Sequence, residues 1–294
     1  MRITETLVYS RLRRETGQAQ ARYDAATLPL MTGQNATRPS EDPSLAAEMA
    51  HLDRGMHRSE QWQKAIDRLD SYYGVVESHV QSAVDLLGAM ETRAIQMKND
   101  SYSATDRLHA AQEVKEALGT LTALSSARQD GRYVFSGRAE SSPPYDAAGA
   151  YQGDPTGRVV PISDGVTIAG DMLATDVFGE SSGTVSAFRA LKQFQEALEK
   201  NDGPAIDAAI LALHDARELA TRAWTRVGSL RSELSQVESF HGDQHAAYET
   251  RKSHIGTVDF ASAATQLRSA EDVYSASVAV SQRVADAIQK ALNL

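Results

Sequence analysis

Two histidines four residues apart are the clearest candidates for chemistry in this chain. His241 and His245 would lie on one face of a helix, where two imidazole rings could bind a single metal ion. No third histidine or cysteine lies nearby to complete a ligand set. Two histidines on a polar helix face are usually solvated, so we expect no metal site here.

Three Asp-Gly pairs resemble calcium-binding loops only in part. Asp130-Gly131, Asp164-Gly165 and Asp202-Gly203 lack the run of alternating oxygen ligands that ends in Glu, so we predict turns. The chain also lacks the glycine-rich phosphate-binding motifs and the G-x-S-x-G elbow of serine hydrolases. We therefore expect no enzymatic activity and no cofactor.

Two short sequences match the N-x-[ST] pattern of glycosylation sites. Asn35-Ala36-Thr37 and Asn99-Asp100-Ser101 both lie at breaks in the helical pattern, where Asn, Ser and Thr are favoured by backbone hydrogen bonding. We interpret both as turns.

The composition narrows the classes of partner. With 294 residues, 41% of them apolar, the chain can bury a sizeable core. Its net charge of -9 disfavours nucleic acid and anionic membranes, so protein partners are expected. No window approaches 18 consecutive apolar residues, and the N-terminus lacks the pattern of a secretory signal. If the chain is exported, we expect another route.

The two ends of the chain carry weak helical seams. The first predicted helix runs from Met1 to about Leu28, and a last amphipathic stretch runs from Asp259 to Leu292. Their seams are built largely of small residues and would bury too little to hold either helix alone. Both helices need neighbours, and we predict an assembly interface formed by Tyr9, Leu12, Tyr23, Leu30, Leu267, Tyr274, Val284 and Ile288.

The strongest periodic signal lies in the second predicted helix. Asp42 followed by Pro43 is typical of a helix start, and the helix is expected to end near Met97. Its apolar residues recur at steps of four and three from Trp62 onward: Trp62, Ile66, Leu69, Tyr73, Val76, Val80, Ala83, Leu87, Met90, Ala94 and Met97. A third helix is predicted from Ala104 to Gln129, with Leu108 on its apolar face and Gly131 as the glycine after its C-terminus.

Turn residues and short β-like runs occupy the middle of the chain. The runs 133–135, 159–162 and 166–168 indicate strands, and the tripeptide 163–165 could turn a hairpin between the last two. Helical periodicity resumes near Val185, breaks at 201–204, and then places Trp224 on the apolar face of a long helix. Residues 255–258 are expected to form a hinge.

The order of the predicted helices and strands along the chain indicates a mainly α fold. The N- and C-terminal segments are expected to form a long antiparallel helical bundle or coiled-coil rod, with a small β-rich insertion at the midpoint. The two termini should lie side by side. We divide the chain into five segments: 1–43, 44–131, 132–184, 185–254 and 255–294.

Several short motifs resemble one family. The sequence opens Met1-Arg2-Ile3-Thr4, continues with Arg38-Pro39-Ser40-Glu41-Asp42-Pro43, and later contains Gly131-Arg132-Tyr133-Val134-Phe135-Ser136-Gly137. Together these are similar to the hook-associated protein 3 branch of the bacterial flagellin superfamily, the proteins of the hook-filament junction. The resemblance spans nearly the full chain. It marks Gly131, Tyr133, Phe135 and Gly137 as a structural motif.

The resemblance implies a function and a location. It implies a structural adaptor, without catalytic residues, that joins the hook to the flagellin filament outside the cell. The implied partners are further copies of the chain, the preceding hook-associated protein, flagellin and an export chaperone, with export through the flagellar type III apparatus. In such an assembly, segments 1–43 and 255–294 would form the inner layer, 44–131 and 185–254 the second layer, and 132–184 would face outward.

Two alternatives stay open at this point. A short filament flagellin would share the helical layers, although the Phe135-Ser136-Gly137 context argues against it. An intracellular coiled-coil binding module would use the long four-three seam as a dimer core.

The weak terminal seams predict that the ends of the chain are its least stable part. Ordering a residue costs about 1 to 2 kcal/mol, and seams of Ala, Thr and Tyr offset little of it. Limited proteolysis of dilute monomer should therefore trim both ends before it cuts 62–97. Equal resistance of the ends and of 62–97 would contradict this expectation.

Overall fold

The computed structural model describes residues 2–35, 39–40, 42–146, 149–180 and 183–292, with the backbone alone described for 2–6 and 291–292. These residues divide into two compact units. The first unit combines Met1–Ser59 with Asp243–Leu294, and the second comprises Glu60–Gly242. The predicted fold class is confirmed, since long helices dominate and the strands are few and short.

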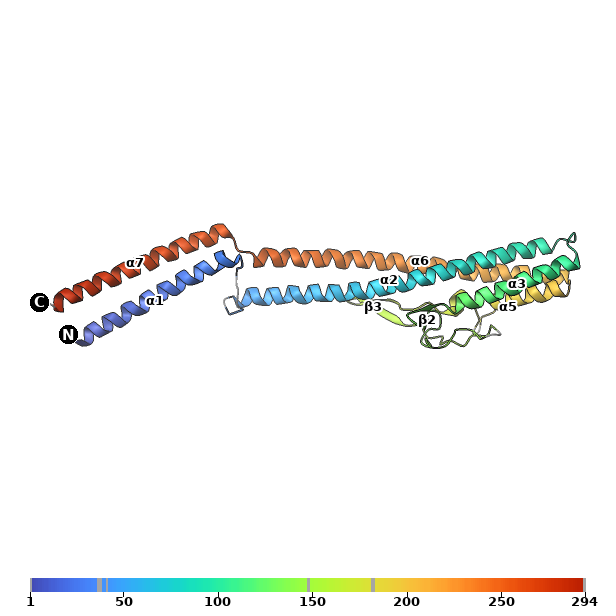
Figure 1. Cartoon of the computed structure of the whole chain (residues 1–294), viewed down its shortest axis with the longest axis horizontal. Coiled ribbons are helices and arrows are strands. Elements are labelled where there is room, and N and C mark those ends of the chain that lie inside the picture. The colour runs from blue at the N-terminus through green and yellow to red at the C-terminus, as the bar shows by residue number, and fades with distance from the viewer. Residues whose placement is uncertain (1, 36–38, 41, 147–148, 181–182, 293–294) are drawn as a thin grey trace. The chain divides into compact units, whose positions relative to one another are not determined.

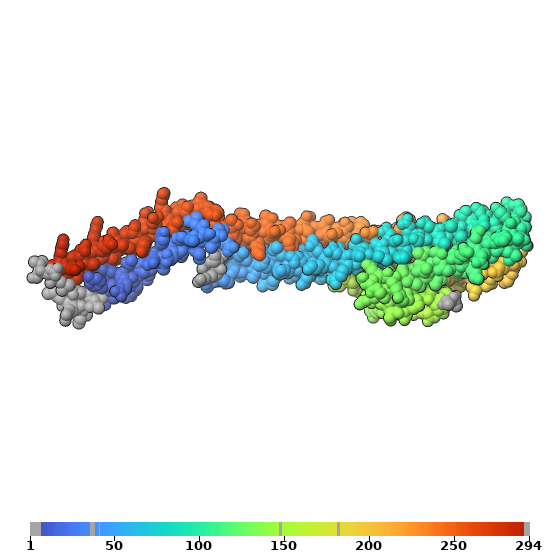
Figure 2. Space-filling model, in the orientation of Figure 1, coloured from blue at the N-terminus to red at the C-terminus, as the bar shows by residue number. Residues whose placement is uncertain are grey.

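The terminal helices pair within the first unit. Helix α1 (Arg2–Thr32) and helix α7 (Phe260–Leu292) lie side by side, so that both ends of the chain emerge together (Figures 1 and 2). Helix α1 runs through Pro29 and ends four residues beyond the predicted Leu28. The helix closes with a further turn after the proline, in which Gly33 N–H donates to Pro29 O at 2.8 Å.

Helix α2 (Pro43–Met97) begins where the sequence predicts. The Asp42 carboxylate accepts backbone N–H groups from Leu45 at 2.9 Å and Ser44 at 3.0 Å, as an N-cap does. The bond from Leu45 and the side-chain bond from Ser44 lower the pKa of the Asp42 carboxyl. Helix α6 (Gly203–Gly256) pairs with α2 and includes Ile255 and Gly256, the first two residues of the predicted hinge.

The predicted seam of α2 forms the core of the second unit. Ile66, Tyr73, Val80, Leu87 and Met97 are at most 1% exposed, as the four-three spacing requires. They pack with a face of α6 that is buried from one end of the unit to the other: Ile206, Ala209, Leu213, Ala216, Ala220, Ala223, Val227 and Leu234.

Ion pairs fix the antiparallel register of α2 and α6 in this unit. The Arg231 guanidinium binds Asp70 at 2.9 Å and Glu77 at 2.6 Å, and both carboxylates raise the pKa of that guanidinium. Trp224 was predicted on the apolar face of α6 but is 37% exposed. Ala220, which was predicted on the same face, is fully buried, and Ala223 is buried beside it.

Helices α3 (Ala104–Ser125) and α5 (Ala187–Glu199) pack against each other in the same unit. Helix α3 ends four residues before the predicted Gln129. Its predicted apolar Leu108 is 52% exposed, because the neighbouring Arg107 takes the buried position. The Arg107 guanidinium donates from Nε to Met97 O at 3.0 Å and from Nη1 to the Asn201 side chain. It thereby satisfies a carbonyl at the end of α2.

Two hairpins and a short helix, α4 (Ala174–Val177), make up the β region, which lies against the helices of this unit (Figure 2). Strands β1 (Arg128–Gln129) and β2 (Arg132–Tyr133) flank Asp130 and Gly131, whose φ values are 51° and 80°. Gly131 therefore occupies a hairpin turn that needs positive φ, and its prediction as a helix-ending glycine is wrong.

The hairpin predicted around residues 163–165 is confirmed. Strands β3 (Val159–Ser163) and β4 (Val166–Ala169) pair antiparallel around Asp164 and Gly165. The predicted turn at residues 99–101 is confirmed too, since Ser101 N–H donates to the Asn99 side chain at 3.0 Å. Of the other sequon, residues 36 and 37 lie outside the described part of the chain.

Polar side chains of the helices hold the second hairpin in place. The Tyr73 hydroxyl donates to Ala169 O at 2.8 Å, and the Tyr72 hydroxyl accepts Met172 N–H at 2.8 Å. Burial raises the pKa of both hydroxyls, which keeps them protonated. His241 Nε2 lies 2.9 Å from Ile162 O.

The prediction that His241 is solvated is wrong. This residue is 1% exposed, and its ring stacks on Trp62 with 6.4 Å between the ring centroids. A carbonyl from the hairpin supplies the hydrogen bond that makes this burial favourable. The sequence around His241 gives no sign of that distant carbonyl.

Phe135 is a sensitive test of this packing. Its side chain is fully buried and meets Phe178 edge to face, with 5.5 Å between the ring centroids. We expect Phe135→Ala to lower the free energy of unfolding by about 3 to 5 kcal/mol. Phe240→Ala is the matched control, since Phe240 is 56% exposed and should cost less than about 1 kcal/mol. Chemical denaturation measures both, and equal small effects would place Phe135 outside the core.

Candidate functional site

The seam between α1 and α7 brings the predicted interface residues together. Thr16 Oγ1 lies 2.9 Å from Ser281 Oγ, and the rings of Tyr23 and Tyr274 stack with 5.9 Å between their centroids. Both contacts step seven residues along each helix, in opposite directions. This register places Tyr9 opposite Ile288, and Leu30 opposite Leu267.

Most of these side chains reach only partial burial. Seven of the eight predicted interface residues are half-buried in the seam, whereas Tyr9 is 43% exposed. Among the described side chains of 7–35 and 257–290, those that are fully buried are Ala19, Val258 and Ala263. The seam therefore pairs the two helices within one chain but covers little of their apolar surface.

Two valines on α7 were missed by the sequence analysis. Val273 and Val280 are 47% and 50% exposed, and their spacing of seven puts them on the same side of the helix. That side lies between the seam and a charged stripe on the same helix, which contains Arg268, Asp272, Arg283 and Asp286. A search for a second seven-residue repeat in the sequence would have found them.

The exposed apolar surface continues on other parts of this unit. Further exposed apolar residues lie on α1 and at the start of α7: Leu7, Val8, Leu28, Met31 and Phe260. Exposed apolar groups that recur along a helix pair mark a surface suited to protein contacts.

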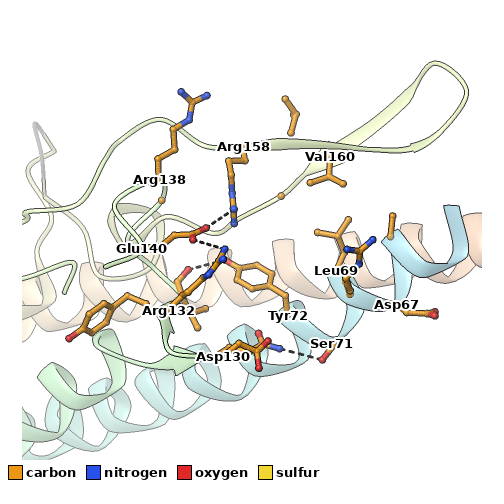
Figure 3. A pocket seen from close by; sticks show the side chains of 18 residues that line it. Asp67, Leu69, Ser71, Tyr72, Asp130, Arg132, Arg138, Glu140, Arg158 and Val160 are labelled. Atoms are coloured by element: carbon orange, nitrogen blue, oxygen red, sulfur yellow. Dashed lines mark hydrogen bonds and ion pairs between the residues drawn. The ribbon is translucent and has the colours of Figure 1, made fainter. Parts of the chain in front are cut away.

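The motif 131–137 builds one wall of a cavity in the second unit. This cavity of about 950 Å³ lies between α2 and the β region, and its apolar side includes Leu69 and Tyr72. Figure 3 shows Arg132 and Arg158 converging on Glu140. The distances from Glu140 are 2.8 Å to Arg132 and 2.6 Å to Arg158, so carboxylates of the chain itself bind these guanidinium groups.

The residues of the motif have structural roles. Gly137 has a φ of 60°, and an added Cβ would lie 2.4 Å from Asp154 O, so no other residue fits. The Tyr133 ring lies under the Arg128 guanidinium, whose carbon is 4.1 Å from the ring centroid. Phe135 is core, and Gly131 forms the turn described above.

Metal binding and membrane spanning are two further possibilities for the residues that the structure describes. Within that part of the chain, no three His, Asp or Glu side chains are grouped so that they could hold a metal ion. None of the described helices is both long and apolar enough to cross a membrane.

Comparison with known proteins identifies the fold. Residues 3–140 match the family model of the bacterial flagellin N-terminal helical region. Comparison with curated protein sequences returned no match.

Similar solved structures include the following three. A protein from Vibrio parahaemolyticus described as flagellar hook-associated has 22% identity and a TM-score of 0.68, covering 74% of this chain and 100% of its own. FlgL of Bacillus cereus has 19% identity and a TM-score of 0.62, covering 69% and 99%. The flagellar hook-associated protein-3 of Legionella pneumophila has 14% identity and a TM-score of 0.62, covering 69% and 97%.

At these identities the solved structures show the fold alone, whereas the family model shows a sequence match over residues 3–140. Both point the same way. Residues 3–140 are thus similar in sequence to the N-terminal helical region of bacterial flagellins, and the chain shares the fold of solved flagellar hook-associated proteins.

Proposed function

We propose that the chain is a structural adaptor of the bacterial flagellum, which joins the hook, through the preceding hook-associated protein, to the flagellin filament. The observation that carries this proposal is the incompletely covered surface of the paired terminal helices. Val273 and Val280 remain about half exposed after α1 and α7 have paired. A subunit of an assembly can bury such residues against its neighbours.

The geometry of the pair suits repeated contacts between copies. The exposed valines lie at the edge of the half-buried seam of α7, so the seam can hold α1 while this edge meets a second subunit. Contacts between two different patches generate rings or helical assemblies. In this proposal, segments 1–43 and 255–294 form the inner layer of such an assembly. Segments 44–131 and 185–254 form the second layer, and 132–184 faces outward.

The proposed partners follow from the same assignment. They are other copies of this chain, the preceding hook-associated protein, flagellin, and a chaperone that accompanies the chain to the flagellar type III export apparatus. The proposed location is outside the cell, at the hook-filament junction. The role requires binding and no catalytic residue. The fold shared with three hook-associated proteins favours this role over that of a short filament flagellin.

Immunogold labelling of intact cells tests the location. An adaptor gives one spot at the base of each filament, because only a short layer of subunits separates hook from filament. Label along the whole filament would instead identify a filament subunit, and no label outside the cell would overturn both assignments.

Charge on the exposed valines tests the assembly surface. In an assembly, Val280→Asp would bury a carboxylate without a partner, at a cost of several kcal/mol in every subunit. In the monomer the same side chain faces solvent, so the free energy of unfolding should change by less than about 0.5 kcal/mol. We expect cells with hooks, flagellin released into the medium, and no attached filaments.

Two further variants calibrate this result. Gln289→Glu adds a carboxylate at an exposed polar position of α7 and should leave filaments attached. Val284→Asp changes a half-buried seam residue, so it should abolish attachment and also weaken the pairing of α7 with α1. Normal filaments in a Val280→Asp strain that secretes the variant at the usual level would remove this surface from the proposal.

A further inference from the structure

Asn35 closes the end of a helix that is far away in sequence. Its backbone N–H donates to Gly256 O at 2.9 Å, and its side-chain amide donates to Ile255 O at 2.7 Å. Ile255 and Gly256 are the last residues of α6, where terminal carbonyls have no partner inside the helix. One asparagine therefore satisfies two of them from the opposite linker.

Gly33 makes the reciprocal contact. It adopts a φ of 71° at the end of α1, and its carbonyl accepts Val258 N–H at 3.0 Å. Between these bonds, Gln34 and Thr257 form an antiparallel bridge. Backbone and side-chain hydrogen bonds thus join the linker that follows α1 to the linker that precedes α7, within one compact unit.

We propose that these two linkers form a clamp that keeps α1 and α7 together in the free chain, with Asn35 as the positioning residue. The seam needs this help because it fully buries so few side chains. The regular backbone hydrogen bonds of α1 and α7 end where each helix meets its linker. The chain therefore bends most easily at the two linkers. A bond between the two bending points forces the helices to move as one body.

The clamp would also favour assembly. If α1 and α7 arrive already paired, less conformational freedom is lost when neighbouring subunits cover them. This last step rests on the proposed function, whereas the pairing itself does not.

The chemistry of Asn35 predicts which substitutions open the clamp. Asn35→Ala removes the side-chain donor and leaves the backbone bond to Gly256. Asn35→Asp replaces the donor with a carboxylate that faces the carbonyl of Ile255, so it should be the more disruptive change. Gln34→Ala is the matched control, because Gln34 is exposed and adjacent in the same linker, and its hydrogen bond to Thr32 Oγ1 is donated by its backbone N–H.

A thiol pair can report on the pairing directly. The chain has no cysteine, so Thr16→Cys with Ser281→Cys introduces the sole thiols, at positions whose hydroxyl oxygens lie 2.9 Å apart. Equilibrating the full chain with a glutathione redox buffer gives the effective concentration of one thiol at the other. From the usual contribution of a single hydrogen bond to stability, we expect this effective concentration to fall about tenfold with Asn35→Asp and about threefold with Asn35→Ala. Gln34→Ala should leave it unchanged.

Circular dichroism of each variant shows whether the helices remain. If Asn35→Asp loses helix content, the Asn35→Ala variant decides the question. The clamp is overturned if a folded Asn35→Ala chain keeps an effective concentration within about twofold of the parent. A folded Asn35→Asp chain, if one is obtained, must then show the same result. Because the thiol measurement uses free monomer, its outcome is independent of where immunogold places the protein.

Discussion

The terminal helices carry too little apolar surface to be stable alone, and the rest of the molecule is arranged around that constraint. Helix α1 has a seam in which only Ala19 is fully buried among its described side chains, and α7 contributes only Ala263. Such a pair gains little from the hydrophobic effect, so it depends on register, on the linkers and on neighbouring molecules. The stacked Tyr23 and Tyr274 set the register, and the linker bonds limit how far the helices can separate.

The second unit, in contrast, has a large buried core. Its seam on α2 is almost completely buried, so stability is supplied by packing, and polar groups are free to specify position. Arg231 shows this division of roles, since its pairs with Asp70 and Glu77 are partly exposed and contribute modestly to stability. They nevertheless fix how α2 and α6 align.

The β region is attached to the helices by buried side chains such as Phe135 and Ile162 and by hydrogen bonds to its backbone. Tyr72, Tyr73 and His241 each bind a backbone group of the hairpin or of the residues that follow it. A short two-stranded hairpin is marginal by itself, so it requires such support. The motif 131–137 lies where these contacts meet, with Phe135 in the core and Gly137 in a position that admits no side chain. These positions explain why Phe135 and Gly137 are suited to the motif.

The sequence by itself determined the long elements. The four-three spacing from Ile66 to Met97 predicted a buried face, and the Asp42-Pro43 pair predicted a helix start, because both signals depend on local periodicity or capping. The hairpin around Asp164 and Gly165 followed from turn chemistry in the same way. The poor seams of the ends also indicated that they would pair, although not in which register.

Only the tertiary structure decided which groups met across long separations in the chain. His241 was assigned to solvent because its hydrogen-bond acceptor, Ile162 O, lies on a hairpin 79 positions earlier. Leu108 was assigned to the core because the sequence did not reveal that Arg107 would bind Met97 O. Asn35 was interpreted as a turn residue, and its contact with α6 spans 220 positions. Periodicity describes one element at a time, whereas hydrogen bonds between elements depend on how the chain returns upon itself.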